Sequence, residues 1–261
     1  MKNSKNIKLI IAYNGTNYSG WQRQENKKTI QESIENAIKQ STGEKEVKLN
    51  GSGRTDAGVH AIGQVANFIT KSSIPISKWP IILNQHLPGD IRIKYARQMD
   101  ENFHARYCAK SRIYRYYIMN RCCEGEKYIS ARTVFVQNYC YFFHRYLDIE
   151  RMRHTAEYLV GCHDFSALSC INQKRSNSIK NKVRNIKRIH ILKKNSLICF
   201  SFEADAFLYK MVRIIIGTLI NFSLNKREPE EIIQILKNKN NQQSGKVIPP
   251  YGLYLVKVKY E

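Results

Sequence analysis

Acidic residues are scarce in this chain of 261 residues, which has 21 Asp and Glu against 43 Lys and Arg and a formal net charge of +22. So large an excess of cations is typical of proteins that bind nucleic acid, because each neutralised phosphate releases counterions. A general lysine bias is the alternative, and the many Asn, Ile and Lys residues are compatible with it. We expect a nucleic-acid partner, and in so basic a chain each well-placed carboxylate is a candidate for chemistry.

Long apolar runs and paired metal-ligand motifs are also absent. No run approaches the roughly 20 residues of a membrane span, and residues 1–8 are not followed by an apolar stretch of signal-peptide length. We therefore expect a cytoplasmic protein with no membrane partner. The seven cysteines contain no Cys-x-x-Cys pair, and the sequence has no P-loop, no dinucleotide-binding glycine pattern and no serine elbow. We expect no metal and no small-molecule cofactor.

Periodicity predicts strands and helices in both halves of the chain, with hairpins favoured over βαβ crossovers. Thr29 and Glu32 have the spacing of a capping box at the start of a helix. Ile91, Ile93 and Tyr95 alternate with cations, as in a half-exposed strand. The fold class expected is α+β with a mostly antiparallel sheet, divided into residues 1–107 and 108–261. Strands are expected at 8–13, 47–50, 64–70, 91–95, 112–119, 182–191, 197–204 and 252–260, and helices from 29 and at 75–86, 147–160, 207–219 and 229–236.

The glycine-rich segment Gly51–His60 contains a single carboxylate, Asp56, close to the guanidinium of Arg54. If the segment is extended, these two side chains lie on the same side. A purely structural turn is the alternative, because a short acid can hydrogen-bond to its own backbone. The surroundings of the loop must decide between a turn and a reactive carboxylate.

Four further features fit RNA recognition or chemistry, and the first three have a structural alternative. Tyr114 lies in an arginine- and tyrosine-rich strand suited to base stacking, although one strand face must pack on the core. Arg213 lies in an otherwise apolar helix, where it either snorkels to solvent or pairs with a carboxylate. Residues 172–194 carry nine Lys or Arg and no acid, which fits an RNA-backbone contact or a solvated face. The polar, aromatic loop at 21–24 could embrace a nucleotide.

Nine short motifs follow one another along the chain: Tyr13–Gly15, Gly20–Gln24, Gly53–His60, Leu87–Ile91, Phe103–Arg106, Tyr114–Tyr116, Gly161–Ser166, Phe207–Gly217 and Gly252–Leu255. Taken together and in order, these motifs are highly specific. The chain resembles the tRNA pseudouridine synthases of the pseudouridine synthase superfamily over nearly its whole length. Residues 208–210 depart from the usual pattern, and residues 170–181 match poorly. The resemblance rests on the nine motifs above.

The resemblance implies isomerisation of uridine to pseudouridine at positions 38, 39 and 40 of the tRNA anticodon stem-loop, without a cofactor. It implies two RRM-like α/β halves that share a central sheet with a basic cleft between them, and a homodimer. It places the catalytic aspartate at Asp56, as nucleophile or base.

The resemblance also implies roles for the other candidates. Arg213 would pair with Asp56, and Tyr114 would stack on the target base and assist proton transfer. Arg54 would help to extrude the nucleotide, and Trp21, Arg23 and His60 would contact substrate. The alternative to an isomerase is a non-catalytic RNA-binding module or tRNA chaperone, which would use the same cations and aromatic residues without needing Asp56.

Overall fold

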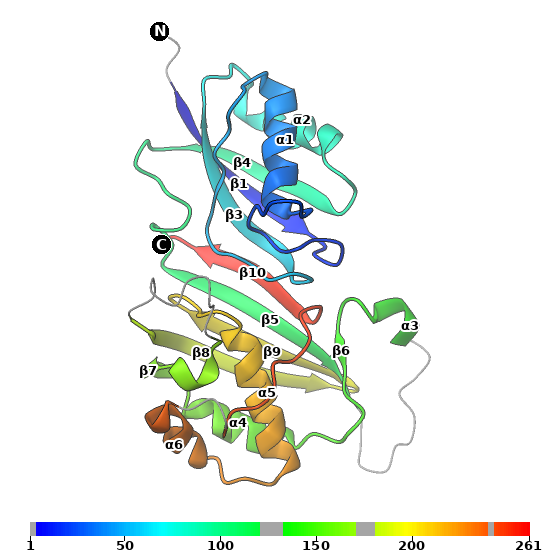
Figure 1. The fold of residues 1–261 in the computed structure, drawn as a ribbon, viewed down its shortest axis with the longest axis vertical. Coiled ribbons are helices and arrows are strands. Elements are labelled where there is room, and N and C mark those ends of the chain that lie inside the picture. The colour runs from blue at the N-terminus through cyan, green and yellow to red at the C-terminus, as the bar shows by residue number, and fades with distance from the viewer. Residues whose placement is uncertain (1–3, 121–132, 171–180, 240–242) are drawn as a thin grey trace. The chain divides into compact units, whose positions relative to one another are not determined.

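The computed structural model describes residues 4–120, 133–170, 181–239 and 243–261, and its strands and helices are drawn in Figure 1. Its contacts divide the chain into two compact units. One comprises Met1–Arg112 with Tyr254–Glu261, and the other comprises Ile113–Leu253. Both units combine strands and helices, and most of the strand pairs are antiparallel, which confirms the predicted α+β class. Every helix in the described part of the chain is too short or too polar to cross a bilayer.

The first unit is a sheet with the strand order β4-β1-β3-β10, together with two α-helices. Strand β1 is antiparallel to β3 and β4, β10 runs parallel to β3, and the short β2 pairs with β3. Alternate residues of β1, such as Ile7, Leu9 and Ile11, are completely buried, as the period of a half-covered strand requires. The elements are β1 (Lys5–Tyr13), α1 (Ile30–Thr42), β2 (Asn50–Gly51), β3 (His60–Thr70), the 3₁₀ helix η1 (Ile76–Lys78), α2 (Trp79–His86), β4 (Ile91–Met99) and β10 (Leu253–Lys259).

The predicted capping box at the start of α1 is wrong. Thr29 is the N-cap residue with an extended backbone, but its side chain makes no capping bond. Backbone carbonyls fill the role instead, because Gly20 O accepts from the Ile30 N–H at 3.2 Å and Trp21 O accepts from the Gln31 N–H at 3.0 Å. The segment around Gly20 is therefore tied to the first turn of α1.

Tyr95 also differs from its expected position. The pairing of β1 with β4 shifts register at Ile10 and Ile11, which lie opposite Tyr95 and Ile93 respectively. Such a β-bulge moves the following residues to the other face of the strand. Ile93 is accordingly buried, whereas Tyr95 is 54% exposed.

The second unit has the strand order β5-β9-β8-β7, with β6 parallel to β5 and with antiparallel β7–β8 and β8–β9 pairs. Helix α5 forms much of its core, since nearly all of its residues are buried. The elements are β5 (Ser111–Met119), α3 (Thr133–Val136), β6 (Tyr141–Phe142), α4 (Ile149–Glu157), β7 (Gly161–Asp164), the 3₁₀ helix η2 (Ser166–Leu168), β8 (Val183–Lys194), β9 (Leu197–Ala204), α5 (Met211–Leu224) and α6 (Glu231–Asn238).

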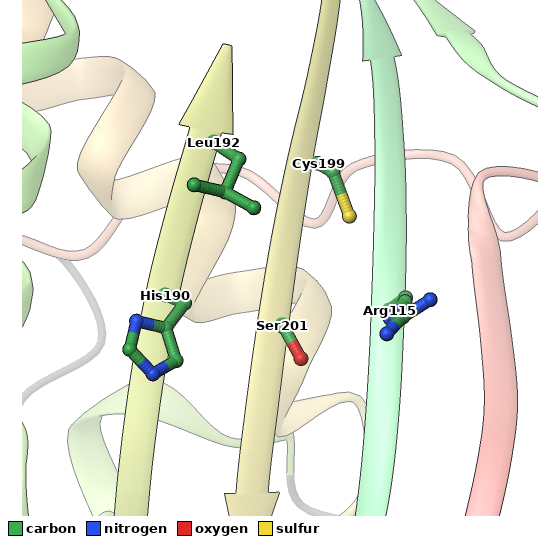
Figure 2. A pocket seen from close by; sticks show the side chains of 5 residues that line it. All are labelled: Arg115, His190, Leu192, Cys199 and Ser201. Atoms are coloured by element: carbon green, nitrogen blue, oxygen red, sulfur yellow. The ribbon is translucent and has the colours of Figure 1, made fainter.

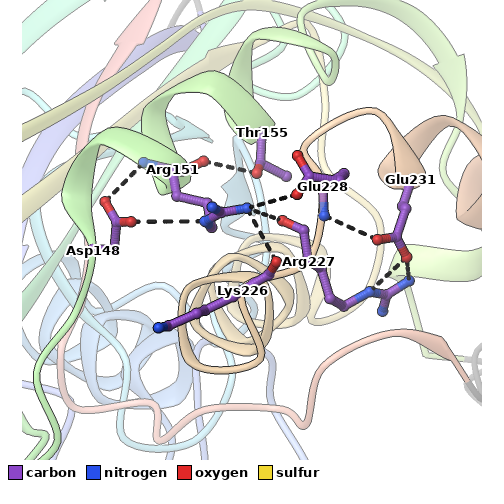
Figure 3. A network of polar contacts seen from close by, with 7 residues as sticks. All are labelled: Asp148, Arg151, Thr155, Lys226, Arg227, Glu228 and Glu231. Carbon is purple, nitrogen blue, oxygen red and sulfur yellow. Dashed lines mark hydrogen bonds and ion pairs between the residues drawn. The ribbon is translucent and has the colours of Figure 1, made fainter.

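A polar network joins α4 to the turn between α5 and α6 (Figure 3). Asp148 caps α4 by accepting from the Arg151 N–H at 3.1 Å. The Arg151 guanidinium donates to the carbonyls of Lys226, at 3.2 Å, and Arg227, at 2.6 Å. Arg227 in turn donates to Glu231 at the start of α6. The network therefore fixes the turn between α5 and α6 against α4.

Candidate active site

The segment that follows β2 and leads into β3 carries Arg54 and Asp56. The β2–β3 pair is antiparallel, with Gly51 opposite Ala66, so the segment forms a loop at one end of a hairpin. Arg54 is exposed and Asp56 is half-buried, whereas Thr55 between them is buried. Both charged residues retain contact with solvent, and the residue between them anchors the loop.

Buried polar side chains form the floor of this loop. Gln64 of β3, which is completely buried, accepts from the Ser52 hydroxyl at 2.7 Å and donates to the Gly53 carbonyl at 3.0 Å. The Tyr13 hydroxyl lies 2.8 Å from the Thr55 hydroxyl. Because buried polar groups need their partners, these bonds hold the backbone on both sides of Arg54 in one conformation.

The preceding loop supports Asp56 from a second direction. The Trp21 N–H donates to the Thr55 carbonyl at 3.1 Å, and the Gly58 N–H reaches the Tyr18 carbonyl at 3.4 Å. Gly20 has φ +95°, and a Cβ there would lie 2.6 Å from the Thr55 carbonyl oxygen. Only glycine combines this conformation with so close an approach of two backbones.

The turn that ends at Asp90 braces the same region. Its carboxylate accepts from the Tyr18 hydroxyl at 2.5 Å, and its carbonyl accepts from the Asn14 N–H at 2.9 Å. Burial, together with this bond to the carboxylate, raises the pKa of Tyr18 well above its ordinary value, so the phenol stays protonated as a donor. Four motifs that are separate in the sequence, at 13–15, 20–24, 53–60 and 87–91, thus meet around the loop of Asp56.

Trp21 and His60, expected to contact substrate, are each only 2% exposed. The Trp21 indole covers Gly51 so closely that a Cβ there would lie 2.5 Å from its Nε1. His60 Nδ1 accepts from the Gly15 N–H at 3.1 Å, and its ring stacks on Tyr254 with centroids 4.7 Å apart. Both side chains pack behind the loop and support it.

Arg23 is exposed at the edge of the same unit. Its guanidinium lies 3.7 Å from a carboxylate oxygen of Glu32 and 3.9 Å from one of Glu35, both on α1. Arg23 is largely exposed, so its pair with the part-exposed Glu32 contributes little to stability, whereas Glu35 is buried.

Arg112 is a residue of this region that sequence reasoning missed. It is 9% exposed, and its Nη2 donates to the carbonyls of Ser52, at 2.8 Å, and Arg106, at 3.0 Å. The start of the Asp56 loop is thereby tied to the segment that follows β4. Its only sequence signal was a cation inside a predicted strand, which does not reveal two backbone partners.

Tyr114 lies in the second unit, on the buried face of β5. It is 7% exposed, and its ring meets Phe207 edge-to-face with centroids 5.1 Å apart. Tyr116 on the same face is completely buried and donates to the Pro249 carbonyl at 2.8 Å. The alternation along β5 is thus resolved, with Tyr114 and Tyr116 inward and Arg115 outward.

A shallow pocket of about 420 Å³ lies on the outward face of the second unit's sheet, over β5, β9 and β8 (Figure 2). His190 lies opposite Ser201, and Leu192 lies opposite Cys199 in the β8–β9 register. None of the predicted site residues lines this pocket, whose side chains are Arg115, His190, Leu192, Cys199 and Ser201.

Arg213 occupies the first turn of α5 and is half-buried. Its Nε donates to the Ile248 carbonyl at 2.7 Å, so the side chain is held by backbone on at least one side. Of the basic segment 172–194, residues up to 180 lie outside the described part of the chain. The remainder places Arg188 on β8 as an exposed cation.

Comparison with known proteins gives a consistent answer. The family model for tRNA pseudouridine synthase matches residues 9–108 and 155–261. The chain is 45% identical to "tRNA pseudouridine synthase A" of Acetivibrio thermocellus over 256 residues, covering 98% of this chain and all of that protein. It is 43% and 45% identical to the proteins of the same name in Thermoanaerobacter sp. (strain X514) and Caldicellulosiruptor saccharolyticus, with the same coverage. The chain therefore belongs to the tRNA pseudouridine synthase family.

Proposed function

We propose that this protein isomerises uridine to pseudouridine in the tRNA anticodon stem-loop, at positions 38, 39 and 40, with Asp56 as its catalytic carboxylate. The observation that carries the proposal is the setting of Asp56. It is a half-buried acid in a loop braced by Gln64, Tyr13, Trp21 and Arg112, in a chain of net charge +22. A purely structural turn does not need such support, whereas a catalytic group must be held close to its productive geometry.

The reaction breaks the C1′–N1 bond of uridine, turns the uracil ring and joins C1′ to C5. In one route the Asp56 carboxylate attacks C1′ and uracil leaves with the electron pair on N1. C5 then attacks C1′, the carboxylate departs, C5 loses its proton and N1 gains one. In the other route Asp56 takes a proton from C2′, the electron pair of that bond forms a C1′=C2′ double bond, and uracil leaves with the pair of the C1′–N1 bond. C5 then bonds to C1′ while C2′ regains its proton, after which C5 loses a proton and N1 gains one. Either route is an isomerisation with no net redox change, so none of its steps requires an oxidant or a reductant.

The remaining site residues divide into four roles in this proposal. As the family resemblance implies, Tyr114 stacks on the target base and assists removal of the C5 proton, and Arg213 pairs with Asp56. Tyr114 is 7% exposed and packs on Phe207, so its ring would have to be uncovered for stacking. Arg54, exposed beside Asp56, helps to extrude the nucleotide, an event that costs a few kcal/mol of stacking. Trp21 and His60 act through the loop that they support, because their burial favours packing over direct contact with RNA.

Several expectations stay predictions from the resemblance. They are the RRM-like character of the two halves, their division at residue 107, the basic cleft, the homodimer and the cytoplasmic location. The contact of Arg23 with tRNA also stays a prediction, and its ion pairs with α1 would have to open for it.

The test begins with purified protein and unmodified tRNA that carries tritium at C5 of uridine. An isomerase releases tritium as C5 forms its new bond, and the pseudouridines formed should map to positions 38, 39 and 40. Replacing those three uridines with cytidine should abolish the release. Binding of tRNA without release from any of several tRNAs would instead favour the RNA-binding module or chaperone.

A further inference from the structure

The segment that follows β4 displays an exposed aromatic cluster. Tyr107 is 76% exposed, and its ring lies against that of His104 with centroids 4.4 Å apart. The guanidinium carbon of the exposed Arg106 lies 5.6 Å from the Tyr107 ring centroid. Tyr107 nevertheless remains about three-quarters exposed, so beside its contacts with His104 and Arg106 the ring keeps surface open to a ligand.

The backbone beneath this cluster is held by hydrogen bonds from other elements. The Ala105 N–H donates to the Asn67 side chain at 2.9 Å, and its carbonyl accepts from the Tyr260 hydroxyl at 2.8 Å. The Arg106 carbonyl accepts from Arg112. Loops usually move more than the elements they connect, but here the backbone at Ala105 and Arg106, directly before Tyr107, is fixed before any ligand arrives.

Two buried asparagine side chains of the sheet hydrogen-bond to the backbone of this loop. Asn6 of β1 and Asn67 of β3 are 4% and 3% exposed, and they are joined at 2.9 Å. Asn6 also donates to the carbonyls of Phe103, at 2.8 Å, and Asp100, at 3.0 Å. Burying an amide is unfavourable unless its hydrogen bonds are made, so side chains placed here are matched to one loop conformation.

The cluster lies in a positively charged neighbourhood. Partial burial, then Arg106, then Lys48 lower the pKa of His104, so its ring stays neutral at neutral pH. A neutral imidazole beside an open phenol ring, with exposed cations nearby, matches a nucleotide with a flat base and a charged phosphate.

We propose that Tyr107, flanked by His104 and Arg106, is a platform on which an unpaired base of the tRNA substrate stacks. The proposal rests on the proposed function, since it takes tRNA as the partner, and it assigns a residue outside the candidate catalytic set. Arg106 is the phosphate contact of the platform, and Tyr107 is its stacking surface.

The platform is linked to the candidate catalytic loop by one side chain. Arg112 donates both to Ser52, at the start of that loop, and to Arg106. A base held on Tyr107 therefore has a set distance to Asp56 within the same unit. Capture at the platform would place the RNA along the unit, so the platform acts on binding rather than on the chemical step.

The test compares Tyr107→Ala, Tyr107→Phe and Tyr107→Trp, with Tyr139→Ala as a matched removal of an exposed tyrosine in the other unit. Loss of one stacked base corresponds to about 1–3 kcal/mol, which is roughly a 5- to 150-fold rise in Kd and KM for tRNA. We expect that rise for Tyr107→Ala, with kcat retained, and near-normal values for the aromatic replacements and for Tyr139→Ala. The Tyr107→Trp fluorescence should be quenched by tRNA, whereas Trp21 and Trp79 are buried.

Salt dependence separates stacking from charge. Tyr107→Ala should weaken binding without changing the slope of log Kd against log salt, while Arg106→Ala should reduce that slope by about one. Unchanged Kd and KM in Tyr107→Ala, an equal loss in Tyr139→Ala, or a change of oligomeric state in Tyr107→Ala alone would each overturn the platform. Absence of pseudouridine formation by the wild-type protein would instead overturn the proposed function.

Discussion

Gly20→Ala is the substitution that most directly tests how the Asp56 loop is held. Gly20 has φ +95°, and an added Cβ would lie 2.6 Å from the Thr55 carbonyl oxygen and 3.1 Å from the Asp56 carbonyl carbon. Ordinary contact begins at 3.4 Å, so the loop backbone must move by about 0.8 Å. A displacement near 1 Å can reduce a catalysed rate about 100-fold. We expect kcat to fall about 10- to 100-fold while Kd for tRNA changes little.

Gly43→Ala is the matched control. Gly43 has φ +73° at the end of α1, and a Cβ there would meet nothing within 4 Å. Both alanines introduce backbone strain of about 1–3 kcal/mol, so both proteins should melt several degrees lower. Only Gly20→Ala should lose kcat. Equal kcat in the two variants, measured by tritium release below their melting temperatures, would refute the view that contact with Gly20 positions Asp56.

Three further predictions concern single side chains. Tyr114→Phe should bind tRNA normally, and its kcat should fall if the hydroxyl transfers a proton; full kcat would remove that role. Arg112→Lys cannot reproduce the two guanidinium hydrogen bonds to the Ser52 carbonyl. An unpaired buried carbonyl costs about 1–3 kcal/mol, so the melting temperature and kcat should both fall. Unchanged values would contradict the role of Arg112 in holding the Asp56 loop. In Asp164, partial burial raises the pKa but bonds from Lys239 and Ser166 outweigh it and lower the pKa to about 2. The ion pair of Asp164 with Lys239 should make the wild type more stable than Asp164→Asn, with the full difference present above about pH 4. The difference in urea midpoint should shrink as the pH falls towards 2. A difference that does not change with pH would exclude this stabilisation by the ionised carboxylate.

Local pattern was enough to predict elements whose determinants lie within a few residues. The predicted hairpin of residues 182–191 and 197–204 is present as β8 and β9, joined through Asn195 with φ +52°. The helix predicted from Phe207 begins only at Met211, because Lys210 adopts a left-handed conformation with φ +59°. Apolar spacing continued across that break and gave no sign of it.

In the candidate site, too, features set by nearby residues could be predicted and features set by distant residues could not. The contact of Arg54 and Asp56 with solvent could be expected, because a short loop between strands presents polar residues; Arg54 is exposed and Asp56 is half-buried. The burial of Trp21 and His60 could not, because it depends on Gly51 and Tyr254, which lie far from them in the sequence. The sequence predicts Gln64 only as a residue of a strand. Its hydrogen bonds to Ser52 and Gly53 depend on the pairing of β3 with β2, which the local pattern does not indicate.

The central claim is that Asp56 performs the chemistry and is not needed for binding. The most direct test is Asp56→Asn beside Asp100→Asn, which removes the same charge from an exposed position in the same unit. Tritium release and Kd for tRNA should be measured on both purified proteins. We predict that Asp56→Asn binds tRNA but forms no pseudouridine, while Asp100→Asn retains wild-type turnover. Turnover retained by Asp56→Asn would contradict the account.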